Sequence, residues 1–459
     1  MISTAIIGEA SIQSNCGVGL AVASHHIGPL LNRVLGRGTF GHRAAVLTVG
    51  TVVAQTVGLL VAPLLTRRYT PAEFGIFGVY AAIVMTLSIV ASGRFEIAIP
   101  LPGSRRTAAR LLLLSIGITA CATLAVAVMG LSLRALLSDL ESMSLLVWAV
   151  PLTVQSAGLL QSLSYWAIRR GGFRALSWAR IVTAILTGVV SLLLAAIGAQ
   201  SVGLILGYLI GQVGGALILF CTEFKSVISA WRDPHTEEHT LSQLVREYRA
   251  YPLVNAPHAL LDGLRDSGVA VVFISLFGSA ANGFFSLGTR VLRAPIGLVA
   301  ASLSQAYLAD ASRLRESGGL YRRTLKLMRL LAIGSAPLYV LVALIAPAAF
   351  AWIFGPEWRE TGEYARLLAP GLYATMLVAP FAQLPSITGR MRQAMTIAVV
   401  DATARGVGLA VAGAVGSARL GVGLFSVISV LSCSYLAIWY LRLARGASSQ
   451  NIARVGGAL

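Results

Sequence analysis

Long apolar runs separated by short polar segments dominate this chain of 459 residues. Such runs predict membrane-spanning helices, because about 20 apolar residues cross a hydrocarbon core of ~30 Å. Continuous runs favour helices over the strands of a membrane barrel, in which apolar and polar residues alternate. The pattern predicts twelve spans, near residues 44–66, 75–93, 111–133, 144–168, 180–199, 202–222, 252–276, 283–306, 327–350, 365–387, 392–414 and 420–441.

The longest polar connection divides the twelve spans into two groups of six, and an internal repeat supports the division. Residues 72–77 (AEFGIF) follow the first span, and residues 280–285 (AANGFF) follow the seventh, 208 residues later. Two parallel six-helix halves form a known transporter architecture with the substrate site at mid-depth between them. We therefore expect an all-α, polytopic membrane protein with two lobes around a central cavity. The expected parts are a cytoplasmic leader (1–43), an N-terminal lobe (44–222), a cytoplasmic inter-lobe loop (223–250), a C-terminal lobe (251–441) and a cytoplasmic tail (442–459).

The composition excludes a soluble enzyme, since 56% of the residues are hydrophobic, 12% are charged and the mean hydropathy is +0.78. A net charge of +18 would suit nucleic acid only if it lay on one solvated face. Here the basic residues stand in short clusters between apolar runs. In the predicted topology, 26 of the 36 lie on the side of both termini, six on the other side and four within spans. The positive-inside rule therefore places both termini in the cytoplasm.

Three local patterns have structural or incidental interpretations. Glycine at every fourth position from Gly203 to Gly215 predicts a seam for close helix packing. Residues 235–239 match the HxxEH pattern of zinc proteases but fall in a polar loop, and we do not expect catalysis there. The glycines of residues 36–41 spell a dinucleotide fingerprint without the preceding strand that it requires. Four scattered cysteines give no disulfide framework or metal site.

Seven charged residues inside predicted spans are the candidates for function. Each would cost about 2.5–3.5 kcal/mol if it faced lipid, so they must face one another or a wet cavity. The substrate-binding candidates are Arg265, Arg290, Arg293 and Arg405, and the ion-coupling candidates are Asp262, Asp266 and Asp401.

Helical spacing suggests how these charges combine, because residues three or four apart share a face. Asp401 and Arg405 can neutralise each other, and Arg265 can bridge the two aspartates of its own span. An aspartate that Arg265 leaves unpaired could carry a coupling proton. Arg290 and Arg293 have no acid on their helix. They therefore bind an anionic ligand or pair with an aspartate of the seventh span, and the planar guanidinium suits phosphate oxygens.

Residues 66–77 (TRRYTPAEFGIF) followed by 94–100 (RFEIAIP) resemble the opening signature of the bacterial oligosaccharide flippase (polysaccharide biosynthesis protein) family. Further matches are Tyr251-Pro252-Leu253 with Pro257, residues 277–295 including Gly283, Arg290 and Arg293, and residues 358–366 (WRETGEYAR). The resemblance covers residues 44–441 and implies the multidrug/oligosaccharidyl-lipid/polysaccharide transporter superfamily.

The resemblance implies a flippase of the bacterial inner membrane, with a cationic cavity in which Arg290 and Arg293 fall. Its cargo would be a polyprenyl-pyrophosphate-linked oligosaccharide for lipopolysaccharide O-antigen, capsule or exopolysaccharide. The anionic head group of that substrate and membrane lipids are the expected partners, together with a coupling proton or sodium ion and a polysaccharide polymerase. We expect no enzymatic activity, no cofactor, no metal and no nucleic acid.

Two alternatives stay open at this point. An ion-coupled drug exporter of the same superfamily would have mainly acidic residues in its cavity, whereas four arginines stand beside three aspartates here. A membrane glycan polymerase would place basic catalytic residues in a large periplasmic loop, whereas the largest loop of this chain is predicted to be cytoplasmic. Tyr80, Tyr165 and Trp166 could stack on sugar rings or serve in packing.

Overall fold

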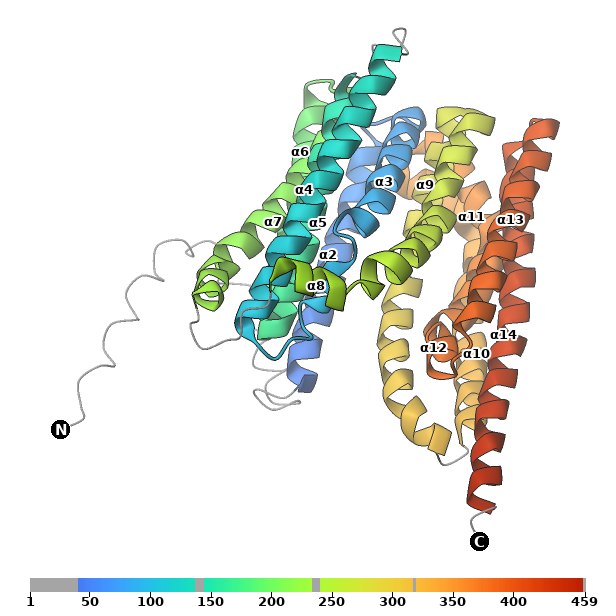
Figure 1. The fold of residues 1–459 in the computed structure, drawn as a ribbon. Helices are drawn as coiled ribbons and strands as arrows, with labels where there is room; N and C mark the ends of the chain where they lie inside the picture. Colours follow the sequence, from blue (N-terminus) through green and yellow to red (C-terminus); the bar gives the residue numbers. More distant parts are fainter. Residues whose placement is uncertain (1–39, 137–143, 233–239, 317–318, 457–459) are drawn as a thin grey trace.

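A computed structural model of the protein describes residues 40–136, 144–232, 240–316 and 319–456, and the regular structure in these ranges is helical throughout (Figure 1). Lobe one consists of α2 (Phe40–Thr66), α3 (Pro71–Ala91), α4 (Arg105–Leu136), α5 (Ser144–Arg170), α6 (Phe173–Ala196) and α7 (Gln200–Trp231). Lobe two consists of α9 (Ala256–Glu316), α10 (Leu320–Phe354), α11 (Arg359–Val378), α13 (Met391–Val415) and α14 (Ala418–Gly456), with the short α12 (Leu384–Ile387). The short α8 (Leu241–Glu247) lies between the lobes in sequence.

Helix α9 supplies two of the predicted spans. Its backbone leaves the helical region at Gly278, where φ is 84° and ψ is 173°, a conformation that glycine adopts without strain. The chain turns back there, so that residues 256–277 and 279–316 act as two helices. Counted in this way, each lobe has six long helices, and the predicted architecture of two six-helix lobes is confirmed.

Nine helical segments of the described residues are long and apolar enough to cross a membrane by length and composition alone. One of them, Ser267–Gly297, runs across the turn at Gly278 and so combines two predicted spans. The predicted spans 144–168 and 365–387 correspond to α5 and α11, which are absent from these nine. Helix α11 packs against α9, α10 and α14. Because protein surrounds much of it, fewer of its residues need to be apolar.

Two apolar clusters form the interior. One runs through both lobes by way of the contact between α3 and α9, which is the most extensive contact between any two described helices. The other is confined to lobe one and α8, and includes the short helix η1 (Phe95–Ala98). In Figure 1 lobe one lies on the left in blue to green and lobe two on the right in yellow to red, with α3 and α9 between them. We call the end where α8 lies the α8 end.

At the opposite end, the Gly75 end, the lobes meet through two glycines that the internal repeat relates. A Cβ atom on Gly75 would lie 1.8 Å from the carbonyl oxygen of Ser279, and one on Gly283 would lie 1.8 Å from that of Pro71. Pro71 and Ser279 are themselves 208 residues apart, so the two halves of the contact are equivalent. The residues repeated in the sequence, 72–77 and 280–285, therefore contain the glycines through which the two lobes touch.

Two buried polar side chains complete the closure at the Gly75 end. The Asn282 amide nitrogen donates to the carbonyl oxygen of Gly75 at 2.8 Å. The indole nitrogen of Trp358, in lobe two, donates to the carbonyl oxygen of Thr66 in lobe one at 2.9 Å. The Trp358 ring also packs edge-to-face on Phe74, with centroids 5.1 Å apart. Both lobes thus contribute to one dry, tightly packed contact.

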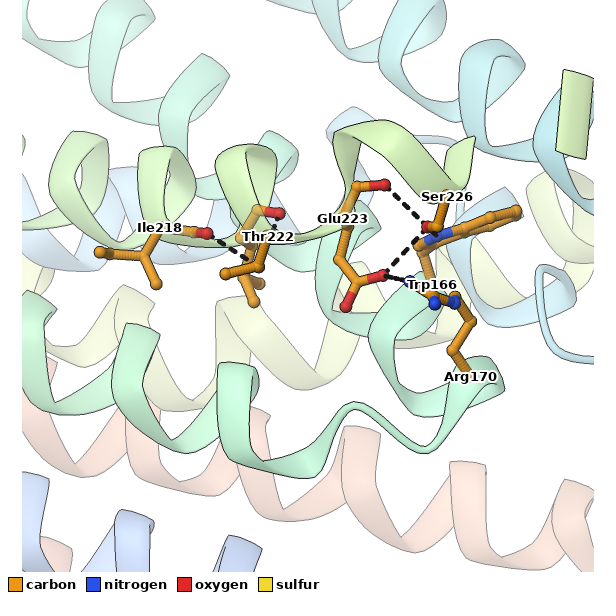
Figure 2. A network of polar contacts seen from close by, with 7 residues as sticks. Trp166, Arg170, Ile218, Thr222, Glu223 and Ser226 are labelled. Atoms are coloured by element: carbon orange, nitrogen blue, oxygen red, sulfur yellow. Dashed lines mark hydrogen bonds and ion pairs between the residues drawn. The ribbon is translucent and has the colours of Figure 1, made fainter. Parts of the chain in front are cut away.

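Lobe one is held together by its own contacts. The glycine seam is confirmed, because a Cβ on Gly203, Gly207, Gly211 or Gly215 of α7 would lie 2.0–2.1 Å from side chains of α6 and the loop before α3. At the α8 end, α5 and α7 are joined as Figure 2 shows. Arg170 pairs with the buried carboxylate of Glu223 at 2.7 Å, and Trp166 donates to the Ser226 hydroxyl at 2.9 Å.

Candidate functional site

A cavity of ≈ 720 Å³ lies where the two lobes face each other. Five helices of lobe one (α2, α3, α5, α6 and α7) line it, and the second half of α9 lines it from lobe two. Helix α2 presents Thr51, Gln55, Gly58 and Ala62 to this space. Their spacing of three or four residues is that of a single helix face, so α2 forms one straight wall of the cavity.

Arg290 and Arg293 reach this cavity from α9. Both side chains are exposed, although they come from the middle of a membrane bundle, because the cavity gives them access to water. The Nη2 atom of Arg290 lies 3.9 Å from the position that a Cβ on Gly58 would occupy, so its guanidinium approaches α2 of lobe one. None of the described residues lining the cavity is acidic. The two arginines are therefore placed to attract an anion.

Lobe one contributes a third arginine, Arg180 of α6, which lines the same cavity. Its Nη1 atom donates to the hydroxyl of Thr51 on α2. Arg180 is not among the candidates predicted from the sequence, because it stands at the start of the predicted span 180–199 and was counted toward membrane orientation. Helix α6 begins earlier, at Phe173, which places Arg180 about two turns inside the helix. A basic residue that far inside an apolar helix was the available signal.

The rest of the polar lining is uncharged. Gln55, Thr183, Thr187 and Gln212 line lobe one's side of the cavity and can donate or accept hydrogen bonds. Tyr208 also lines it and packs edge-to-face on Phe77, with centroids 5.9 Å apart. This mixture of hydroxyl, amide and aromatic groups suits a ligand rich in hydroxyl groups.

The aromatic residues singled out in the sequence serve mainly in packing. Tyr80 is buried and donates to the carbonyl oxygen of Ala149 at 3.2 Å. Trp166 is buried in the network of Figure 2. Tyr165 packs against the lobe-one cluster. Tyr208 and Phe77 take the places at the cavity that these residues could have filled.

Arg405 and Asp401 lie apart from this cavity. The Arg405 Nε atom is 3.0 Å from the Asp401 carboxylate on the same helix, and its guanidinium lies over the Phe425 ring, 4.6 Å from the centroid. Arg405 borders a second, largely apolar pocket of ≈ 300 Å³ between α9 and α13. Of the two roles open to this pair, the structure has the mutual ion pair, and it does not bring Arg405 together with Arg290.

Some predicted features fall outside the described residues. These are residues 1–39, which hold most of the expected leader and the first glycines of the 36–41 motif, and the HxxEH pattern at 235–239. The side chains of Asp262, Arg265 and Asp266 are also outside the described part of α9. Their roles in binding or coupling stay predictions.

The family follows from a comparison with protein-family models. The model of a family described as polysaccharide biosynthesis protein matches residues 64–363, from the end of α2 into α11. This chain belongs to that family. The match contains the glycine contact, Arg180 and the arginine pair of α9. Comparison with curated proteins finds no match.

Solved structures share the fold of this family member. Lipid II flippase MurJ, in its inward closed conformation, has a TM-score of 0.66 at 12% identity over 89% of this chain and 91% of that one. The Vibrio cholerae MATE transporter VcmN has a TM-score of 0.58 at 16% identity over 88% and 96%. A MOP superfamily transporter from Pyrococcus furiosus has a TM-score of 0.59 at 13% identity, over 89% of this chain and 96% of that one. The chain thus has the fold of this transporter superfamily.

Proposed function

We propose that this protein is an alternating-access flippase of the bacterial inner membrane. Its cargo is an oligosaccharide linked to a polyprenyl pyrophosphate, moved from the cytoplasmic to the periplasmic leaflet for O-antigen, capsule or exopolysaccharide synthesis. The observation that carries the proposal is a cavity between the lobes that holds three arginines and, among its described lining, no carboxylate. Membership of the polysaccharide biosynthesis protein family supports the same cargo.

Arg290 and Arg293 bind the pyrophosphate. They stand one turn apart on α9, which lets two planar guanidinium groups approach the oxygens of adjacent phosphates. Hydrogen bonds between a guanidinium and a phosphate are charge-assisted and therefore stronger than neutral ones. The neutral groups of lobe one hydrogen-bond the sugars.

The prenyl tail stays in lipid through a gap beside the cavity. A side pocket of ≈ 360 Å³ lies between α2, α9 and α10 and shares Gln55, Leu59 and Val291 with the cavity lining. Its other lining residues include Leu338 and Val342, which are apolar. A long hydrocarbon chain can therefore leave the cavity laterally without passing charged groups.

Rocking of the lobes moves the opening from one leaflet to the other. With both termini in the cytoplasm, the Gly75 end faces the periplasm, and the contact described there is the closed periplasmic side. Release requires this contact to separate while the α8 end closes. Because Asp401 pairs with Arg405, we assign any coupling to a proton or sodium ion to Asp262 and Asp266.

A deletion strain tests the proposal. We expect lipid-linked oligosaccharide to accumulate in the cytoplasmic leaflet, and plasmid-borne wild-type protein to clear it. The double variant Arg290→Gln/Arg293→Gln should lower clearance at least about tenfold, because it removes charge-assisted hydrogen bonds to the pyrophosphate. Arg419→Gln is the matched control, since Arg419 bonds Glu360 on the surface and lies outside the cavity.

The same strain distinguishes the other candidates. Altered polymer length without accumulation of the lipid-linked unit would favour a glycan polymerase instead. Increased drug sensitivity without accumulation would favour a drug exporter. The absence of carboxylates from the described cavity lining disfavours that exporter, because cationic drugs need acidic partners.

A further inference from the structure

We infer that Arg180 forms a second anion subsite, which binds a carboxylate on the glycan, separate from the site of the pyrophosphate. The inference rests on the proposed function and adds to it the chemical class of the cargo, an acidic oligosaccharide. It assigns the arginine of lobe one to the glycan and the arginine pair of lobe two to the lipid head group.

The distance between the two subsites can be measured along helix α2, because each arginine lies beside a different residue of that helix. The Arg180 guanidinium is bonded to Thr51, and that of Arg290 lies beside Gly58. Thr51 and Gly58 are on the same cavity face of α2 and seven residues apart, which corresponds to about 10 Å along the helix. A pyrophosphate held by Arg290 and Arg293 together is bound from α9, which leaves the Thr51 end of this α2 face to another group of the cargo. Arg293 is one turn from Arg290 on α9 and belongs to the pyrophosphate subsite.

Charge balance favours an anion at Arg180. A pyrophosphate diester carries one negative charge on each phosphate at neutral pH, which matches Arg290 and Arg293 and leaves the third arginine without a counter-charge. The partner that the structure gives Arg180 is a neutral hydroxyl. An isolated cation in a membrane bundle is costly unless a charged ligand compensates it. The cargo that fits all three arginines therefore carries at least one further acidic group.

The surroundings favour a carboxylate on a sugar. Gln55 lies between Thr51 and Gly58 on α2, and Thr183, one turn from Arg180, lines the same wall. These uncharged groups suit the hydroxyls of the sugars between the pyrophosphate and the acid. A guanidinium binds a carboxylate through two parallel hydrogen bonds, a geometry that a uronic acid can offer from the edge of its ring.

Binding to the purified full-length protein in detergent tests the inference. The probes are sodium pyrophosphate, trigalacturonate and the neutral maltotriose, measured by calorimetry on wild type and variants. We expect Arg180→Gln to weaken trigalacturonate about tenfold or more and to change pyrophosphate affinity less than about twofold. The double variant Arg290→Gln/Arg293→Gln should show the opposite pattern. Wild type should bind both anions together, and maltotriose more weakly than trigalacturonate.

Several outcomes would overturn the two-subsite assignment. Competition between trigalacturonate and pyrophosphate, equal weakening of both by Arg180→Gln, or equal affinity for maltotriose would each do so. Arg419→Gln should retain binding of both probes, and Arg180→Lys, which keeps the charge but not the paired hydrogen bonds, should weaken trigalacturonate less than Arg180→Gln does. Unchanged thermal unfolding of each variant excludes misfolding. The proposed function fails separately, if pyrophosphate binding is independent of Arg290 and Arg293 and the deletion strain accumulates no lipid-linked oligosaccharide.

Discussion

At the Gly75 end the backbones of α3 and α9 touch, whereas at the α8 end a side-chain hydrogen bond joins lobe one to Asn255, the residue before α9. That bond runs from the Nε atom of Arg94 to the side-chain oxygen of Asn255 at 3.1 Å. It is exposed, so water can replace it at a cost of about 1 kcal/mol or less. The glycine contact has no such substitute, because its closeness depends on the absence of side chains.

This difference between the two ends indicates that contacts at the Gly75 end stabilise the described conformation. Separating the lobes at the Gly75 end exposes the apolar cluster around Phe74 and Trp358 and breaks the buried bond of Asn282. Toward the α8 end, α3 and α9 meet through side chains, where a Cβ on Gly263 would lie 3.3 Å from the Ile89 side chain, and the bond of Arg94 is exposed. If the protein works by alternating access as proposed, the Gly75 end is where the described contacts oppose separation of the lobes most, and a bound substrate would supply the compensating free energy.

The largest expected effect comes from adding a methyl group at the glycine contact. Gly283→Ala should destabilise the protein by about 3 kcal/mol or more and abolish flipping, because the new Cβ would collide with the carbonyl oxygen of Pro71. Gly297→Ala is the matched control on the same helix, since a Cβ there meets nothing within 4 Å. Thermal unfolding and clearance of lipid-linked oligosaccharide measure both variants. Equal behaviour of the two would contradict the close contact.

A disulfide across the same contact should stop transport without unfolding the protein. A Cβ on Gly78 would lie 3.2 Å from the Cβ of Ser286 in the other lobe, close to the separation that a disulfide bridges. In a protein with its four native cysteines replaced by serine, Gly78→Cys/Ser286→Cys should lose flipping when oxidised and regain it when reduced. Each single variant is the control. Undiminished flipping by the cross-linked protein would exclude separation at this end.

A matched pair of asparagines compares the two ends directly. Asn282→Ala should lower the free energy of unfolding by about 1–2 kcal/mol, because it removes a buried hydrogen bond between the lobes. Asn255→Ala should change it by less than about 0.5 kcal/mol, since its bond is exposed. Denaturant or thermal unfolding of both variants provides the measurement. A larger loss for Asn255→Ala would reverse the comparison.

The smallest effect is a pH dependence at the α8 end. Glu96 is buried in the connection between α3 and α4, where Gln161 donates to it at 3.0 Å. Burial raises the pKa of Glu96 above its usual range, although hydrogen bonds from Ser92 and Gln161 and the charge of Arg94 oppose the shift. The folded protein therefore favours the protonated carboxyl more than the unfolded chain does.

Stability from this group is full below the ordinary glutamate pKa and is lost as pH rises through the raised value. We expect the unfolding temperature to fall over that window and the fall to be smaller in Glu96→Gln, which cannot ionise. The pH series uses Asn282→Ala as a control with the carboxyl intact. If wild type and Glu96→Gln show the same pH dependence of the unfolding temperature, Glu96 does not cause it and the prediction is wrong.

Much of the fold was predictable because its signals are local. Most spans are continuous apolar runs, and the seam from Gly203 to Gly215 is visible as a spacing of four. The repeat around Gly75 and Gly283 predicted the two lobes. The turn at Gly278 lies in the gap between two predicted spans, although hydropathy alone combines them as Ser267–Gly297.

The site was predictable only in part. Arg290 and Arg293 were identified because no acid shares their predicted span, 283–306. Arg180 was missed, since its depth depends on α6 beginning at Phe173 and its role depends on Thr51, 129 residues away. The choice between pairing and ligand binding for Arg405 was open in the sequence, because either arrangement satisfies a buried charge.

The sequence by itself determined the helical membrane fold, its two halves and the presence of arginines inside spans, since the membrane imposes length and apolarity residue by residue. The tertiary structure alone decided which charges meet. It pairs Arg405 with Asp401 and gathers Arg180 with Arg290 around α2. It also makes the repeated glycines into the contact between lobes. These outcomes depend on distances between segments far apart in the chain, which no local pattern contains.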